Sequence, residues 1–343
     1  MDVLLDDFKS DLARMKKLQG LIALLDGFRA HQKPGAGGNP FLGHATLLHD
    51  AVMASHADLL VLSGAMILYL GGRFEFYVRE RFEQACEAIG VKSASLDHLP
   101  KPMKEKLVLM TAEVMLKPRK FGHAEKGVES FVKRLAANMS ATDGVKELNH
   151  ECLSITTENM RTGVLKDLFE RVGCKDIWQM IGEQACVRTH FATVQVVEAK
   201  SKCTKYLDDF MDVRNRIAHP SANVEWPNLA KVGEYITYFD ILAKAISDVI
   251  ELHEISIPNT ILAPAPQPLA PAFPAALVPA NGLAPVAAAA AQQATPAPQT
   301  MAPGPGFPQS EAPANLAAAP VQQAPADNRA EAQPHQAPDP PEA

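Results

Sequence analysis

Apolar residues spaced three and four positions apart run through nearly all of the chain before Pro258, and this spacing most constrains the fold. It matches the 3.6-residue period of an α-helix that buries one side. Near the N-terminus the pattern is continuous at Leu5, Phe8, Leu12, Met15, Leu18, Ile22 and Leu25. No pair of alternating strands joined by hairpin residues is visible. The sequence therefore predicts an all-α fold.

Further helices are expected wherever the same spacing continues between Gly- and Pro-rich breaks. Their expected ranges are 45–89 with a break near Gly71-Gly72, 103–116, 124–139, 162–172, 175–182, 186–218 with a break near Val194, and 228–253. Trp178 is expected to anchor the short 175–182 helix in the core. The Gly/Pro cluster at 34–40 predicts a loop. It lacks the G-x-x-x-x-G-K-[ST] pattern and does not indicate a phosphate site.

The last part of the chain differs sharply in composition. Of the 27 prolines, 20 lie at or after Pro258, among alanine and glutamine. Such a sequence buries too little apolar surface to offset its ordering entropy, which predicts a disordered tail over 258–343. Its Pro268-x-x-Pro271-x-x-Pro274 run fits a polyproline II groove of a partner, but a stiff linker is the interpretation we favour. Residues 1–40 are assigned to an N-terminal helix and loop, and 41–257 to a helical domain.

Charge and hydropathy exclude several classes of protein. The formal net charge is −6, and because the tail is acidic, the part before Pro258 is close to neutral. Nucleic-acid binding would thus need a local basic cleft rather than a broad basic face. The N-terminus is acidic where a secretory signal would be basic. The most apolar run, Leu59 to Gly72, is shorter than a membrane span, so we expect no membrane segment and a cytoplasmic protein.

Neither the cysteines nor the histidines before His219 and at His253 have the spacing of a metal site, so no metal and no cofactor is expected. The five cysteines form no C-x-x-C pair, which argues against a zinc site or a disulfide framework. His44, His49 and His56 are expected to be structural or exposed, since metal ligation prefers an i, i+4 pair. No role is assigned to His123, His150, His190 and His253.

The segment Arg214-Asn215-Arg216-Ile217-Ala218-His219 ends a predicted helix at Pro220. On a continuous helix Arg214 and His219 would lie about 140° apart, whereas Asn215 and His219 would share a face. The residue before a proline is pushed out of the α region. We therefore expect His219 at the helix end, where its ring can turn into a cleft and Asn215 can orient it.

These residue types suit cleavage of RNA by its own 2′-hydroxyl. An imidazole such as that of His219 can accept the hydroxyl proton or donate one to the leaving oxygen. The guanidinium of Arg214 can hold the phosphate, and Arg216 adds a second positive charge. The mechanism requires no metal, and DNA lacks the reacting hydroxyl. The structural alternative is that Arg and His only interact with the negative end of the helix dipole.

The Arg-Asn-(x3)-His string resembles the R-N-x-x-x-H signature of the HEPN superfamily, especially its RiboL-PSP and MAE-type branches. The tract 73–80 is similar to an earlier helix of that family, with its E-x-x-x-[KR] element at Glu75 and Arg79. The stretch 164–173 also resembles the segment before the final helices. These three stretches follow the family's order and span Ser55 to Leu252.

This resemblance implies a HEPN-like helical bundle, usually dimeric, in which two such motifs face each other across the two-fold axis. Active members cut RNA without metal, and many act in phage defence or toxin–antitoxin systems. By this resemblance His219 is the acid or base, Arg214 contacts phosphate and Asn215 orients the ring. Glu75 and Arg79 support the site. The proline at 220 departs from the glycine that many members carry there.

Three functions remain open at this stage. The first is a homodimeric endoribonuclease, a hydrolase of the toxin or antiviral-defence kind whose partners are RNA and an antitoxin. The second is a non-catalytic HEPN module that binds RNA or assembles with an adaptor protein through its Pro-rich tail. The third is a helical scaffold in which the Arg–His string only ends a helix.

Overall fold

The computed structural model describes residues 2–35, 39–122, 125–141, 144–219 and 225–261. Within these ranges all regular secondary structure is helical, so the predicted all-α class is confirmed. The predicted tail lies outside the described residues from 262 onward. The division of the chain at residues 40 and 257 stays a prediction.

The helices are α1 (Val3–Arg29), α2 (Pro40–Ala54), α3 (His56–Val91), α4 (Lys101–Leu116), α5 (Glu125–Ser140), α6 (His150–Leu153), α7 (Thr162–Glu170), α8 (Ile177–Glu183), α9 (Ala185–His190), α10 (Val196–Ala218) and α11 (Leu229–Ser256). Two short 3₁₀ turns, Leu96–His98 and Pro118–Phe121, flank α4.

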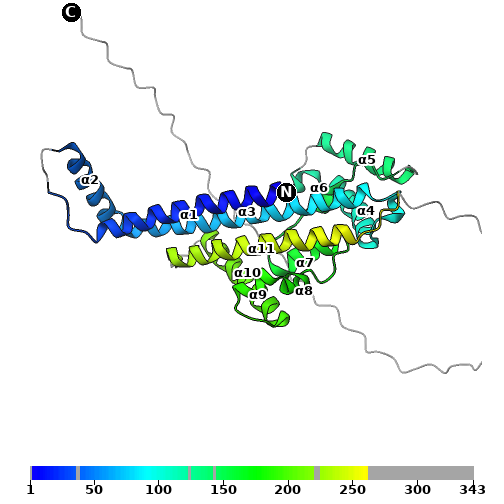
Figure 1. Ribbon diagram of the computed structural model, residues 1–343. Coiled ribbons are helices and arrows are strands. Elements are labelled where there is room, and N and C mark those ends of the chain that lie inside the picture. The colour runs from blue at the N-terminus through cyan, green and yellow to red at the C-terminus, as the bar shows by residue number, and fades with distance from the viewer. Residues whose placement is uncertain (1, 36–38, 123–124, 142–143, 220–224, 262–343) are drawn as a thin grey trace, which may run out of the picture. The chain divides into compact units, whose positions relative to one another are not determined.

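Three long helices, α1, α3 and α11, lie side by side and form the main body of the bundle (Figure 1). α3 runs antiparallel to α1 and parallel to α11. α10 packs against α3, with α7, α8 and α9 beside it, while α4, α5 and α6 gather at the C-terminal end of α3. α2 contacts α1 near the opposite end.

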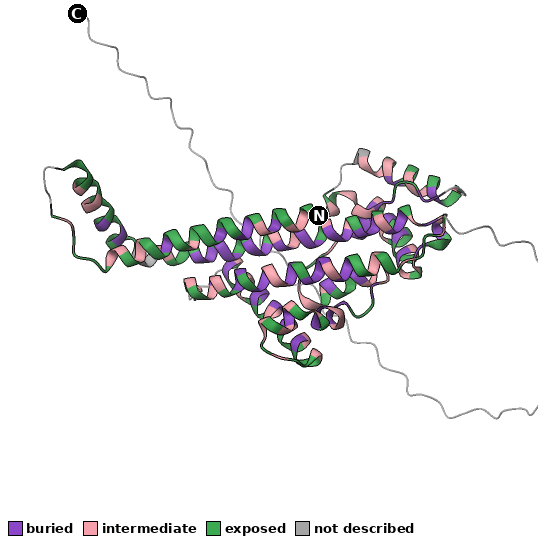
Figure 2. Cartoon of the chain, viewed as in Figure 1, coloured by how far each residue is buried: buried purple, intermediate pink, exposed green. Residues whose placement is uncertain are grey.

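Aromatic side chains from four helices join the core. The Phe74 ring of α3 and the Phe210 ring of α10 each lie 4.6 Å from the ring of Phe239 on α11. Phe8 of α1 stacks on Tyr77 of α3 at 5.1 Å. All five rings are buried, and Figure 2 shows the buried residues on the facing sides of the long helices. Each such side chain contributes roughly 1.5–3 kcal/mol by leaving water.

A buried charge ties the start of α1 to the end of the bundle. Asp2 caps α1 by accepting a hydrogen bond from the Leu5 amide at 3.1 Å. Its carboxylate also lies 3.9 Å from the guanidinium of Arg81, which pairs with Glu254 of α11 at 2.7 Å. Since removal of either partner would leave a buried charge, this triad fixes the register of α1, α3 and α11.

Most expected helices are present with ends that differ by a few residues, but α6 was not predicted, α2 begins at Pro40 in the predicted loop, and one predicted break is misplaced. The break near Val194 is confirmed, because α9 ends at His190 and α10 begins at Val196. Trp178 is buried, and its indole N–H donates to the Thr162 carbonyl at 2.9 Å. The break predicted at Gly71-Gly72 is wrong: the interruption falls at Ser55, and α3 continues through both glycines.

The glycines of α3 serve close packing instead. A Cβ atom on Gly71 would lie 3.4 Å from Cγ of Arg214 and 3.6 Å from the Phe210 ring. A Cβ atom on Gly64 would lie 2.2 Å from the ring of Trp226. A Cβ at Gly71 would make only ordinary contacts, but the absence of one at Gly64 lets Ile217 of α10 and Trp226, before α11, approach α3 closely. That requirement outweighs the weak helix propensity of glycine.

Among the described residues, the segment Asp58–Val91 of α3 is long and apolar enough to cross a membrane by length and composition, with a mean hydropathy of 1.4 in its most apolar window. Only 39% of that window is buried inside the bundle. α3 packs against α1, α10 and α11 on one side, and its other side is exposed.

We predict that Gly64→Ala lowers the free energy of unfolding by about 1–3 kcal/mol, since the new methyl group overlaps the Trp226 ring. The midpoint of urea denaturation measures this change. Gly20→Ala is the matched control, because a Cβ there meets no atom within 4 Å and the helix gains about 0.5–1 kcal/mol. Equal midpoints for the two variants would contradict the packing argument.

Candidate functional site

The end of α10 has the form that Pro220 predicts. The helix stops at Ala218, and His219 is its C-cap with a backbone outside the helical region. The His219 amide still donates to the Asn215 carbonyl at 3.0 Å. The ring of His219 is exposed, so it is free to meet a ligand or a second chain. Pro220 itself lies outside the described residues.

Arg214 is held against α3 with part of its hydrogen-bonding capacity unused. Its aliphatic stem packs over Gly71, and its Nη1 donates to the side-chain oxygen of Asn215 at 3.3 Å. Its Nε is buried and has no hydrogen-bond partner among the described residues. A buried unpaired donor on a permanent cation is costly.

Asn215 joins α10 to the segment between α6 and α7, residues 155–161, which we call the site loop. The side-chain oxygen of Asn215 accepts hydrogen bonds from Asn159 of this loop and from Arg214. The amide is therefore held in one orientation, as expected of a residue that positions a reacting group.

The site loop is fixed to two helices. The Met160 side chain is buried, and its amide donates to the Glu75 carboxylate at 3.4 Å. Arg161 pairs with Asp212 of α10 at 2.5 Å. The Thr162 amide, at the start of α7, donates to Asp208 of α10 at 3.0 Å. The loop is thus clamped between α3 and α10, over the predicted site.

A cavity of about 450 Å³ lies under this loop. Its lining consists of Glu75, Arg79, Thr156, Thr157, Glu158, Asn159, Arg161 and Asn215. The structure thus brings together three residues predicted from separate parts of the sequence, Glu75, Arg79 and Asn215. Arg214 adjoins them through its hydrogen bond to Asn215. Two other predicted site residues, Arg216 and His219, are exposed and do not belong to the described lining of this cavity.

The cavity continues along α3. A neighbouring cavity of about 340 Å³ shares Arg79 and Thr156 with it and reaches Lys120 and Glu83. Cationic and anionic side chains alternate along both, with Arg79 and Arg161 close to Glu75 and Glu158. The site is thus a local mixed-charge groove, in keeping with the nearly neutral charge of the chain before Pro258.

Sequence reasoning missed Asn159 and Arg161, which complete the site from the loop. Residues 155–161 carry no periodic pattern, and only the tertiary fold places them beside α10. Two of the histidine predictions are confirmed: His49 is buried and bonds to the His31 carbonyl, and His44 is exposed. The His56 side chain lies outside the described residues. His150, to which no role was assigned, contacts two carboxylates.

The described residues include no cluster of three His, Cys, Asp or Glu side chains arranged to hold a metal ion. The five cysteines are free thiols, four of them buried. Burial raises the pKa of the Cys174 thiol to about 11, which makes that thiol unreactive near neutral pH.

The chain is an all-helical bundle with an Arg-Asn pair and a polar cavity at the end of α10. The sequence model of the RiboL-PSP-HEPN family matches residues 44–252, from α2 to α11. The match covers more than half of the chain, and the chain belongs to this HEPN family. No curated protein and no solved structure matches it. The resemblance drawn from the motifs is thereby confirmed, while the roles of individual residues stay predictions.

We predict that Asp208→Ala loosens the site loop, because the Thr162 amide at the start of α7 loses its acceptor. The loss of a helix cap costs about 1 kcal/mol, which corresponds to roughly fivefold faster amide hydrogen exchange in residues 155–162. Asp209→Ala is the control: Asp209 forms only an exposed pair with Lys205 on α10. Unchanged exchange in Asp208→Ala would show that the loop is held by other contacts.

Proposed function

We propose that this HEPN protein is a metal-independent endoribonuclease that cuts RNA through attack by the 2′-hydroxyl. The observation that carries the proposal is the end of α10. There Arg214 has an unused buried donor, Asn215 is held in one orientation, and His219 leaves the helix with an exposed ring. Family membership supports an RNA-related function in general.

In this mechanism His219 accepts the proton of the 2′-hydroxyl or donates one to the leaving 5′-oxygen. Arg214 holds the scissile phosphate and stabilises the negative charge that develops on it. Asn215 orients the reacting groups, while Arg216, Glu75 and Arg79 support the site. Arg161, on the site loop, is a further cation for the phosphate backbone of the RNA.

A second copy of the chain would complete the site. The N-terminal half of α3 exposes an apolar stripe at Val61, Ala65, Leu68, Gly72 and Phe76, at successive three- or four-residue steps. The stripe runs beside Gly71, which contacts Arg214, and beside Glu75 of the cavity. Dimerisation through it would bury the apolar side of α3 and bring two α10 ends toward one another.

The biological setting we propose is phage defence or a toxin–antitoxin system in the cytoplasm, with an antitoxin or adaptor as the partner. Family membership is the support for this setting. Growth arrest on expression of the parent chain, but not of His219→Ala, is the outcome expected of a toxin.

The second candidate is a non-catalytic RNA-binding or assembly module. The mixed charge of the cavity favours it, since Glu75 and Glu158 repel the phosphate backbone of RNA. This function predicts intact RNA after incubation, and a partner that co-purifies only when residues after Pro258 are present.

We predict that the purified chain cleaves single-stranded RNA in EDTA, leaves 2′,3′-cyclic phosphate ends and does not cut DNA. His219→Ala should slow cleavage by about 10²–10⁴-fold, because the proton transfer is lost. Gel analysis of end-labelled RNA measures both rates. His44→Ala, at an exposed histidine of α2, is the control. If His219→Ala cut as fast as the parent, the assignment of the site would be wrong.

We predict that Leu68→Glu converts a dimer to a monomer and abolishes cleavage without unfolding the chain. A charge in the middle of the exposed stripe would be desolvated in the dimer but solvated in the monomer. Sedimentation velocity and circular dichroism test this outcome. Leu109→Glu, at a more exposed leucine of α4, is the control and should leave the assembly unchanged. If both variants formed dimers to the same extent, the dimer interface would lie elsewhere on the chain.

A further inference from the structure

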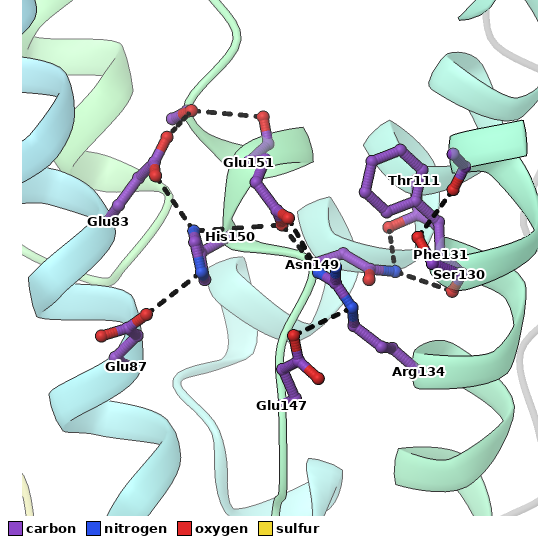
Figure 3. Close-up of polar contacts among 12 residues, drawn as sticks. Glu83, Glu87, Thr111, Ser130, Phe131, Arg134, Glu147, Asn149, His150 and Glu151 are labelled. Atoms are coloured by element: carbon purple, nitrogen blue, oxygen red, sulfur yellow. Dashed lines mark hydrogen bonds and ion pairs between the residues drawn. The ribbon is translucent and has the colours of Figure 1, made fainter. Parts of the chain in front are cut away.

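A polar cluster at the C-terminal half of α3 surrounds one histidine (Figure 3). The ring of His150 on α6 lies between two carboxylates of α3. Its Nδ1 is 3.1 Å from Glu83 and its Nε2 is 3.1 Å from Glu87. The His150 and Glu83 side chains are only 19% and 17% exposed, so their contact lies largely away from water, whereas the Glu87 side chain is exposed.

Both contacts are satisfied at once only by the protonated ring. A neutral imidazole donates from one nitrogen and presents a lone pair at the other, which would face a carboxylate lone pair. The imidazolium donates from both nitrogens. A protonated His150 would therefore bridge α6 and two successive turns of α3.

The charges around His150 come from each neighbouring helix. α3 supplies Glu83 and Glu87, together with Glu80 and Arg79 further away. α6 supplies Glu151, 3.9 Å from the ring. α5 supplies Arg134, which pairs with Glu151 at 2.8 Å and with Glu147 at 3.2 Å and neutralises part of the negative charge.

The bridge continues directly into the site loop. The Ser154 hydroxyl, at the end of α6, donates to Glu83, the carboxylate that also binds His150. The next residue, Ile155, begins the loop, and its carbonyl accepts from Arg171 of α7 at 2.8 Å. Asn149, next to His150, ties α6 to α5 through the Phe131 carbonyl at 2.9 Å. Glu83 thus joins α6 and the start of the loop to α3.

We infer that His150 is a positioning residue whose protonated ring holds α6 and the site loop on α3, so that protonation of one side chain controls the assembly of the site. A short series of contacts connects His150 to the site. His150 and Ser154 both bind Glu83, residues 155–158 follow in sequence, and Asn159 then donates to Asn215. The inference rests on the proposed function only where RNA cleavage is the measurement.

The direction of the pH effect follows from the two partners. The hydrogen bond to Glu83 raises the pKa of His150 above its ordinary 6.5, against the opposing effect of burial and with help from Glu151, Glu83 and Glu87. The stabilisation is therefore complete below pH about 6.5 and is lost as pH rises through the higher folded value.

Burial alone would raise the pKa of Glu83, but the hydrogen bonds from His150 and Ser154 outweigh it and lower that pKa below 4.5. The contribution of Glu83 is present above pH about 4.5 and is lost as pH falls through the lowered folded value. The bridge is thus complete between about pH 4.5 and pH 6.5, and it is lost as pH rises through the raised folded pKa of His150.

The experiment is amide hydrogen exchange of the full chain across pH 6 to 9, expressed as protection factors to remove the intrinsic pH dependence of exchange. In the parent, protection of residues 155–161 should fall about tenfold over this range, while the core of α11 stays protected. In His150→Gln the loop should be weakly protected at every pH. In His150→Arg, which keeps a charge at every pH, protection should persist to pH 9.

His253→Gln is the matched control, because His253 is a partly buried histidine whose Nε2 contacts only the Val172 carbonyl at 3.1 Å. It should keep the parental pH profile. Parental protection that does not change with pH, or loop protection in His150→Gln equal to that of the parent, would overturn the inference. Exchange is measured whether or not RNA is cut, so failure of the proposed nuclease activity leaves this result readable.

Discussion

The close contact of α10 with α3 is the constraint on which the rest of the site depends. It is made by the Phe210, Phe74 and Phe239 rings and by the absence of a side chain at Gly64, beside Ile217 of α10. Because both helices are rigid and share this aromatic core, Arg214 and Asn215 stand at a fixed distance from Glu75. A catalytic group on a rigid helix end keeps its geometry better than one on a free loop.

Electrostatics near the cavity are local and balanced. The bundle has little net charge before Pro258, so long-range steering of a polyanion is weak. In the proposed function, contact with RNA would depend on Arg79 and Arg161 in the cavity lining and on Arg214 beside Asn215. The neighbouring carboxylates have structural partners: Glu75 accepts from the loop backbone and Glu83 from α6. Glu75 and Glu83 thus help to assemble the site, while Arg161 is paired with Asp212 and Arg214 with Asn215.

Sequence alone predicted the helices and the Arg-Asn-(x3)-His segment, because amphipathic spacing and Pro220 act locally. It failed at Gly71-Gly72, where glycine signals a close neighbour and not a break, and only the position of Arg214 reveals this. It also missed Asn159 and His150. Their partners, Asn215 and Glu83, are 56 and 67 residues away, and no local pattern encodes a contact over such a separation.

The unusual length of α3 has a physical reason in this arrangement. Its exposed apolar stripe up to Phe76, the cavity residues Glu75 and Arg79, and the bridge at Glu83 and Glu87 follow one another along one helix. Glu75 and Glu83 are separated by about 12 Å at 1.5 Å per residue, and the helix transmits that spacing without bending at its glycines. A dimer contact on the stripe and a proton on His150, if both form as proposed, would therefore act on the same helix. Through α3 both would reach the cavity residues Glu75 and Arg79.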